Sequence, residues 1–213
     1  MLTRALNLFI LTTTLNLLGA DPLVATFSIV ARDPLTGEIG VAVQSKFVAV
    51  GSVVPYAEAG VGAIASQALG NVRYGPIGLK LLREGKSARD VVALMTQADP
   101  RQAHRQLGVI APEGNSSIHT GTKCMDWAGG QTGRNFAVQG NLLAGPEVIE
   151  AMAEGFKEAN GTLAERMIDS LRAGQREGGD KRGRQSAALL VVRKGWGYGG
   201  LNDRFRDLRV DDH

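Results

Sequence analysis

Short runs of β-forming residues alternate along this chain with residues that favour turns. Residues 26–32 and 39–44 are rich in β-formers, and the turn residues between them predict a hairpin. Residues 61–67 are small and apolar, which is typical of a strand that is buried on both faces. The same pattern predicts further strands at 106–110, 116–120, 136–141 and 186–192.

Four other stretches have the start signals and the apolar stripes of amphipathic helices. The first covers 74–83, and the second covers 87–98 with Ser87 as the expected N-cap. The third starts at Pro146, a residue that is favoured at the first helical position. The fourth starts at the capping box Thr162-Leu-Ala-Glu165.

The predicted element order is β-β-β-α-α-β-β-β-α-α-β, so strands and helices come in runs. Such runs favour layers of an α+β fold over an alternating parallel sheet. Two helix pairs that cover two stacked, mainly antiparallel sheets would form a four-layer αββα sandwich. Residues 50–59, with Gly51 and Pro55, predict a loop or an irregular edge. No repeat or linker divides residues 26–213, so we expect one domain there.

Composition excludes several classes of function. The net charge of +3 and the lack of a basic face with interleaved aromatic residues argue against nucleic-acid binding. Cys124 has no second cysteine with which to form a disulfide and no adjacent histidine, which favours an inert thiol. Asp211, Asp212 and His213 are consecutive, and three such side chains in a strand cannot all face one ion. We therefore expect no metal and no cofactor.

The N-terminus resembles a targeting segment. Arg4 is followed by an uncharged stretch from residue 5 to residue 20, which has the length of a secretory apolar region and is short for a membrane span. Small residues at Ala20 and Ala25 offer cleavage points. We expect residues 1–25 to be a signal peptide, and the protein to be periplasmic or secreted with no stable membrane span. One alternative is that residues 1–25 are an uncleaved anchor. The other is that the start is placed too far upstream, and the protein would then be cytoplasmic.

Thr26 is the first residue after this leader. If cleavage falls before it, the hydroxyl and a new α-amine lie on one residue, which pairs a nucleophile with a base. An N-terminal amine has a pKa near neutrality and suits that task. The alternative is that Thr26 is simply a good strand residue.

Several long motifs of the chain resemble those of one family. They include Thr-Phe-Ser-Ile-Val-Ala-Arg-Asp-Pro from residue 26, Val-Gln-Gly-Asn-Leu-Leu-Ala-Gly-Pro from residue 138, and Gly-Gly-Asp-Lys-Arg-Gly-Arg-Gln-Ser-Ala-Ala-Leu from residue 178. On these motifs residues 26–213 closely resemble the bacterial and archaeal family called domain of unknown function 1028 (DUF1028). The resemblance implies the αββα fold of the N-terminal-nucleophile (Ntn) hydrolases, without a settled substrate. Some relatives carry a peptidoglycan-binding module, which hints at the cell wall.

The resemblance also indicates where a site would lie. Thr26 would be the nucleophile, and the backbone N–H of Gln67 and the side chain of Asn141 would bind an oxyanion. Supporting residues would come from the end of the second strand and from the loop before the last one. These are Gln44, Ser45, Lys46, Asp180, Arg184, Gln185 and Ser186. Gln44 stands where an aspartate is common in proteasome-like relatives. For each supporting residue, a polar strand end or a solvated loop is the alternative.

We therefore expect a hydrolase of an amide or related C–N bond in a small-molecule or peptide-like substrate. The rival hypothesis is an exported binding or assembly domain that keeps the sandwich without the chemistry, and the lack of an acid at Gln44 favours it. A third is a protein whose only reaction is cleavage before Thr26. We also expect a homo-oligomer, namely a dimer.

Overall fold

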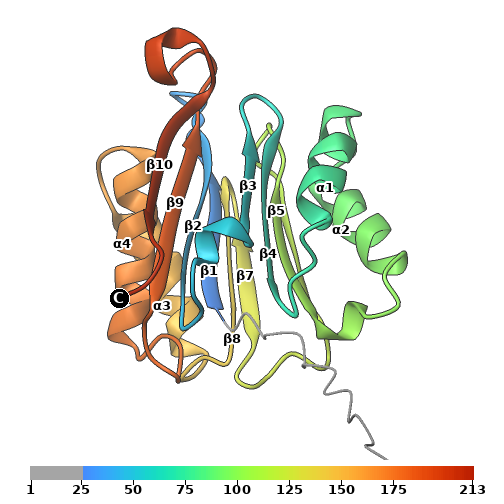
Figure 1. Ribbon diagram of the computed structural model, residues 1–213, viewed down its shortest axis with the longest axis vertical. Helices are drawn as coiled ribbons and strands as arrows, with labels where there is room; N and C mark the ends of the chain where they lie inside the picture. Colours follow the sequence, from blue (N-terminus) through green and yellow to red (C-terminus); the bar gives the residue numbers. More distant parts are fainter. Residues whose placement is uncertain (1–25) are drawn as a thin grey trace, which may run out of the picture.

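Two antiparallel sheets lie face to face in the computed structural model, which describes residues 26–213 (Figure 1). The six-stranded sheet has the order β10-β9-β2-β1-β8-β7, and the four-stranded sheet has the order β3-β4-β5-β6. The strands are β1 Thr26–Arg32, β2 Ile39–Ser45, β3 Pro55–Glu58, β4 Gly62–Ala68, β5 Arg105–Ile110, β6 Ser116–Thr120, β7 Gly129–Gly133, β8 Phe136–Asn141, β9 Ser186–Val192 and β10 Arg204–Val210.

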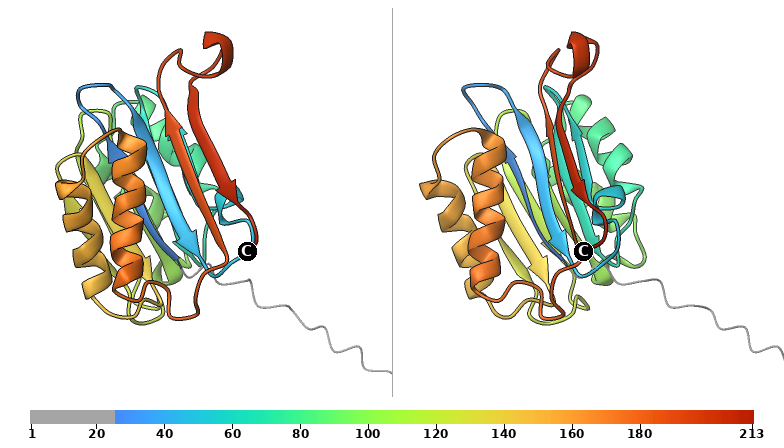
Figure 2. Two further views of the ribbon diagram at one scale, coloured as in Figure 1. Left: turned by 90° about the vertical axis from the view of Figure 1, so that its left-hand side faces the viewer. Right: turned by 60° about the vertical axis from the view of Figure 1, so that its left-hand side comes forward.

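Helix pairs cover the outer faces of both sheets (Figure 2). Helices α1 Tyr74–Arg83 and α2 Ala88–Gln97 pack on the four-stranded sheet, and α3 Glu147–Glu158 and α4 Leu163–Arg176 pack on the six-stranded sheet. Short 3₁₀ turns are η1 Val50–Ser52, η2 Gln102–His104 and η3 Tyr198–Gly200. The architecture is therefore an α+β sandwich of the predicted αββα type.

Two of the expected helix starts are confirmed by their caps, whereas Pro146 is the N-cap of α3 and not its first residue. The Ser87 side chain accepts a hydrogen bond from the backbone N–H of Asp90 at the start of α2. Thr162 and Glu165 form the reciprocal capping box that starts α4. Each cap satisfies backbone donors that the first helical turn leaves without partners.

Each pair of neighbouring layers encloses an apolar cluster, and strand alternation decides which cluster a residue joins. In β1, Phe27 and Ile29 pack against α3 and α4, whereas Val30 packs between the two sheets. Thr26 and Ser28 lie on the same face of β1 as Val30, because side chains two residues apart share a face. The start of β1 therefore turns two hydroxyl groups into the space between the sheets.

Three strands depart from the predicted element order. Strand β3 lies where we expected a loop or an irregular edge, and β7 and β10 were not expected at all. Strand β3 is four residues long and starts at Pro55, and β7 is the glycine-rich segment Gly-Gly-Gln-Thr-Gly. Strand β10 is charged and exposed. All three lie at sheet edges, where burial does not select an apolar pattern.

The predicted leader, residues 1–25, lies outside the described residues. Within residues 26–213, no helix has both the length and the apolar character that a membrane span requires.

Candidate active site

Thr26 begins one of the central strands of the six-stranded sheet. Its side chain is buried, and its Oγ1 donates a hydrogen bond to Ser45 Oγ across a distance of 3.1 Å. Thr26 lies opposite Ser45 of β2 on one side and opposite Asn141 of β8 on the other. The structure therefore brings three of the predicted site residues together at one end of the inter-sheet space.

Amide side chains from both sheets surround this position. Gln67 Nε2 donates to the carbonyl oxygen of Thr26 at 3.3 Å and to Gln106 Oε1 at 2.9 Å. Asn141 Nδ2 donates to the same oxygen of Gln106 at 3.0 Å. Gln106 Nε2 in turn donates to the carbonyl oxygen of Gly140 at 2.7 Å. Gln106 therefore joins Gln67 and Asn141, and no pattern in the sequence indicated it.

The network continues along β1. Ser28 Oγ donates to Gln67 Oε1 and accepts from Gln139 Nε2, with both distances at 2.6 Å. Gln67, Gln106 and Gln139 are fully buried. Since buried amides need partners, these side chains bond to one another, and among the described residues only Gln139 Oε1 of this set lacks a hydrogen-bond partner. We call Ser28, Gln67, Gln106, Gln139 and Asn141 the amide network.

Gly108 allows the two sheets to approach each other at this network. A Cβ atom at Gly108 would lie 2.2 Å from Gln139 Oε1, which is closer than any real contact. The absence of a side chain in β5 thus creates the space that Gln139 of β8 occupies. The packing of the amide network therefore depends on this small residue as well as on its polar ones.

Three of the predicted supporting residues hold the end of β2 in place. The carboxylate of Asp180 accepts from the Lys46 backbone N–H at 3.2 Å and from the Arg182 guanidinium at 2.7 Å. The Gln185 backbone N–H donates to the carbonyl oxygen of Ser45 at 3.0 Å, and Ser186 Oγ donates to the Phe47 carbonyl oxygen. These contacts position Ser45, which in turn contacts Thr26.

The other supporting residues point elsewhere. Gln44 is paired with Phe27 and so faces α3 and α4, on the opposite side of the sheet from the Thr26 side chain. Its Nε2 donates to the carbonyl oxygen of Gly183 at 3.5 Å. The side chains of Lys46 and Arg184 are exposed. The residue that approaches the Thr26 hydroxyl from β2 is therefore Ser45 and not Gln44.

The comparisons with known proteins cover the same region. The model of DUF1028, described as a family of unknown function, matches residues 26–213, so the match begins at Thr26. The chain belongs to the DUF1028 family. Its structure is similar to the crystal structure of protein SPO2555 from Silicibacter pomeroyi, a DUF1028 protein, with a TM-score of 0.80 and 33% sequence identity. The alignment covers 89% of this chain and 82% of that one. No curated protein matches the chain.

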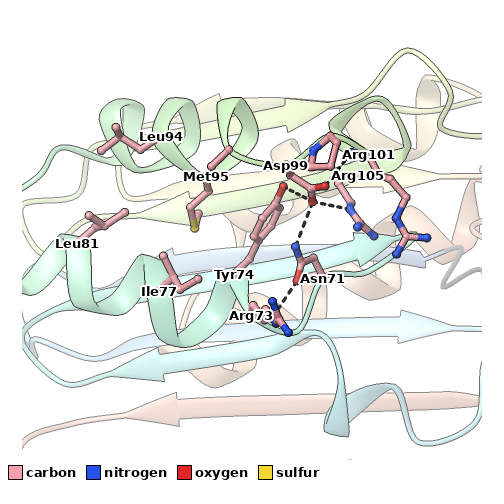
Figure 3. A pocket seen from close by; sticks show the side chains of 12 residues that line it. Asn71, Arg73, Tyr74, Ile77, Leu81, Leu94, Met95, Asp99, Arg101 and Arg105 are labelled. Atoms are coloured by element: carbon pink, nitrogen blue, oxygen red, sulfur yellow. Dashed lines mark hydrogen bonds and ion pairs between the residues drawn. The ribbon is translucent and has the colours of Figure 1, made fainter.

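A second polar cluster, which sequence patterns did not indicate, lies on the other face of the four-stranded sheet (Figure 3). Asp99 Oδ2 accepts from Arg105 Nε at 2.8 Å, from the Tyr74 hydroxyl at 2.9 Å and from Asn71 Nδ2 at 3.1 Å. Asp99 Oδ1 accepts from the Arg101 backbone N–H at 2.8 Å. We call Asn71, Tyr74, Asp99 and Arg105 the Asp99 cluster.

Opposing effects act on the ionisation of this cluster. Burial raises the pKa of Asp99, but hydrogen bonds from Arg105, Arg101, Tyr74 and Asn71 outweigh it and hold the pKa far below its usual range. Burial, followed by the hydrogen bond to Asp99 and its charge, raises the pKa of Tyr74 far above its usual value. Asp99 is thus ionised, and the Tyr74 hydroxyl is protonated, throughout the neutral range.

The remaining reactive side chains do not join either cluster. Cys124 is half-buried, its Sγ donates to the carbonyl oxygen of Arg105 at 3.3 Å, and burial raises the pKa of its thiol. That environment gives little thiolate at neutral pH. Within residues 26–213, no group of three or more His, Cys, Asp or Glu side chains is placed to hold a metal ion.

Proposed function

We propose that this protein is an exported Ntn hydrolase that cleaves an amide or related C–N bond, with Thr26 as the nucleophile after leader removal. The observation that carries the proposal is the position of Thr26. It is the first residue of the family match and of a central strand, and its hydroxyl is hydrogen-bonded at 3.1 Å beside the amide network.

The proposed chemistry follows from having the hydroxyl and the α-amine on one residue, Thr26. Thr26 Oγ would attack the substrate carbonyl carbon while its proton passes to the α-amine of the same residue. The C–N bond then breaks, the leaving nitrogen takes that proton, and an ester to Thr26 remains. Water attacks this ester, the α-amine again transfers the proton, and the products are a carboxylic acid and regenerated Thr26.

The surrounding amides have separate tasks in this scheme. The Asn141 side chain uses one amide hydrogen on Gln106 at 3.0 Å, and we assign its other hydrogen to the developing oxyanion. The Gln67 side-chain amide donates to the carbonyl oxygens of Thr26 and Gln139 and to Gln106, so it positions Thr26. The backbone N–H of Gln67, which we expected to be a second donor, points at Gln106 in the β4–β5 pair and is not assigned to the oxyanion.

The first experiment identifies the N-terminus of the protein that is recovered from its host. Intact mass and N-terminal sequencing should find Thr26 as the first residue. A mature chain that begins at Asp21 or retains Met1 has no α-amine on Thr26 and would rule out this mechanism.

The second experiment tests the chemistry on that mature form with a panel of amide substrates. Thr26→Ala should lower kcat by at least about 1000-fold, because it removes the nucleophile. Thr26→Ser, which keeps a hydroxyl and the α-amine, is the matched control and should retain turnover. A glycine inserted before Thr26 should also abolish turnover, since it moves the amine to another residue. Equal turnover by wild type and Thr26→Ala would place the chemistry elsewhere.

A non-catalytic binding domain, associated with the cell wall in the manner of some relatives, is the second candidate. The observation that favours it is the neutrality of Ser28, Ser45, Gln67, Gln106 and Asn141, which provide no charge to tune the amine. This candidate predicts that the mature chain turns over no amide of the panel, whichever residue it begins with.

We also propose that two copies of the chain pair through β10, the exposed edge strand of the six-stranded sheet. Leu208 and Val210 are 56% and 48% exposed there. An antiparallel pairing centred on Leu208 would set Asp207 opposite Arg209 of the second copy. It would also cover an unpaired strand edge, which proteins otherwise protect.

A charge exchange tests this pairing. Light scattering should show a dimer for the wild type and a monomer for Asp207→Arg, which sets two arginines opposite each other. Adding Arg209→Asp to Asp207→Arg restores opposite charges and should restore the dimer. A monomeric wild type, or a double variant that stays monomeric, contradicts the proposal.

A further inference from the structure

A cavity of about 620 Å³ opens between α1, α2 and the loop that follows α2 (Figure 3). Sites for small molecules usually have volumes of about 300–1,000 Å³. The cavity borders the Asp99 cluster and is separated from Thr26 by the four-stranded sheet, so it is not part of the proposed active site. Its two halves differ in chemistry.

Aliphatic side chains line the half that lies between the helices. Ile77 and Leu81 come from α1, and Leu94 and Met95 come from α2. Ile77 is 47% exposed and Leu94 is 45% exposed, although both are large aliphatic residues. A ligand with an apolar body would remove this surface from water, which is favourable in proportion to the area covered.

Polar groups form the other half, and Asp99 is the only acid among the lining residues. Its two carboxylate oxygens already accept hydrogen bonds from four donors. Its charge is also compensated by Arg105, whose side chain is only 6% exposed. Asp99 therefore has little capacity left to bind a cationic ligand.

Arg73 lines the same half and adds a positive charge to it. Arg73 is exposed, and the lining residues provide no second acid beside Asp99 to pair with it. Within residues 26–213, the Arg73 guanidinium has no hydrogen-bond or ion-pair partner. A guanidinium that faces a cavity suits a carboxylate, to which it can donate two parallel hydrogen bonds.

We propose that this cavity binds a small carboxylate that carries an aliphatic chain. The chain would lie against Ile77, Leu81 and Leu94, and the carboxylate would contact Arg73. The proposal does not rest on the hydrolase proposal, because neither Thr26 nor the amide network takes part in it.

The test uses the full chain with ¹³C-labelled methionine methyl groups and octanoate as the probe, followed by NMR. Met95 lines the cavity, whereas Met152 and Met167 lie in the core beneath α3 and α4 and are internal references. Octanoate should shift the Met95 methyl signal saturably and leave the two references unchanged. Octanol, which has the chain without the charge, octylamine, which reverses the charge, and acetate, which lacks the chain, should each bind at least about tenfold more weakly.

Variants then separate the two halves of the cavity. Arg73→Gln removes the positive charge and should weaken octanoate binding about tenfold without affecting octanol. Leu94→Glu places a negative charge on the apolar wall and should abolish octanoate binding. Arg89→Gln is the matched control, because Arg89 is an exposed arginine of α2 that does not line the cavity, and its affinity should equal that of the wild type.

Three results would overturn the proposal. The first is a Met95 signal that octanoate does not shift at concentrations up to about 10 mM, since that excludes useful affinity. The second is equal affinity for octanoate, octanol and octylamine. The third is an Arg73→Gln variant that binds octanoate as tightly as the wild type and the Arg89→Gln control do. Because Arg73 is exposed, none of these results depends on a change in the core.

Discussion

The two buried polar clusters of this protein lie on opposite faces of one strand and are made of different groups. Arg105 and Gln106 are consecutive in β5, so their side chains point to opposite faces of the four-stranded sheet. Gln106 belongs to the amide network between the sheets, which contains only neutral amides and a hydroxyl. Arg105 belongs to the Asp99 cluster under the helices, which is centred on an ion pair.

The difference shows that buried neutral groups and buried charged groups need different hydrogen-bond partners. Neutral amides can be both donors and acceptors, so they fill a space between two sheets without requiring a charge. A buried carboxylate needs several donors and a cation, and Asp99 obtains them from a loop, from α1 and from β5. We therefore expect the amide network to be insensitive to pH and the Asp99 cluster to be sensitive to it.

The largest effect should follow from removal of the charge at Asp99. Asp99→Ala leaves the Arg105 guanidinium buried without its partner, and removal of one partner of a buried pair costs about 3–5 kcal/mol. Urea unfolding at neutral pH measures this loss in the free energy of unfolding. Asp169→Ala is the control, because Asp169 pairs with Arg172 on the surface and such pairs contribute at most about 1 kcal/mol. Equal losses in the two variants would show that Asp99 does not stabilise the fold.

The same residue should make stability depend on acid. The pKa of Asp99 is lower in the folded state than its unfolded value of about 3.9, so the unfolded state binds the proton more readily. The stabilisation is therefore fully present above that value and is lost as the pH falls below it. The difference in unfolding free energy between wild type and Asp99→Asn should shrink between about pH 5 and pH 3. A difference that stays constant over this range would contradict the lowered pKa.

A substitution in the amide network should lower the free energy of unfolding by a large amount that, unlike the Asp99 effect, does not depend on pH. Gln106→Ala removes the acceptor for Gln67 and Asn141 and the donor for the Gly140 carbonyl oxygen, and we expect a loss of about 3 kcal/mol. Because these partners are neutral, the loss should be the same at about pH 4 and pH 7. Gln97→Ala, at an exposed position of α2, should change stability by no more than about 0.5 kcal/mol. A pH-dependent loss in Gln106→Ala would reveal an ionised group in the network.

A smaller effect should follow from filling the space beside Gln139. The Cβ atom of Gly108→Ala would lie 2.2 Å from Gln139 Oε1, so the buried Gln139 side chain must shift, at a cost of about 1–3 kcal/mol. Gly70→Ala is the matched control, since its nearest atom would lie at an ordinary 3.5 Å. If both variants unfold at the same urea concentration, the close approach of the sheets at Gly108 does not limit packing.

Most of the fold could be predicted from the sequence, because local signals and burial agree in the central elements. The capping box at Thr162 and the Ser87 cap gave the helix starts, and apolar strands such as β9 gave the sheet interior. Strand β10 could not be predicted in this way. It pairs with β9 on one side and its other edge is exposed, so its charged sequence lacks the alternation of apolar and polar residues that predicts a half-buried strand.

The candidate site was predictable only where family motifs identified it. Thr26, Ser45, Gln67 and Asn141 are the predicted residues that meet, whereas Gln44 lies on the wrong face to reach the Thr26 side chain because strand alternation carries it away. Gln106 was missed because it lies in an apolar strand and its role depends on contacts with another sheet. Asp99 was missed because the side chains that bond to it are 6 to 28 residues away along the chain.

The smallest effect that we predict tests the contribution of a single donor to the Asp99 cluster. Tyr74→Phe removes the hydroxyl that donates to Asp99 Oδ2 at 2.9 Å and should cost about 1.5 kcal/mol at neutral pH, because hydrogen bonds to charged groups contribute more than neutral ones. Since this hydroxyl stabilises the ionised carboxylate, its loss raises the folded-state pKa of Asp99 toward the unfolded value. The deficit of Tyr74→Phe in the free energy of unfolding should therefore shrink only in strong acid, at about pH 1.5, where part of the folded carboxyl is protonated. Urea unfolding at both pH values measures it, and Tyr198→Phe, at a position 91% exposed, is the control that should show no deficit. If the Tyr74→Phe deficit is equal at both pH values, the hydroxyl stabilises the fold through contacts other than its bond to ionised Asp99.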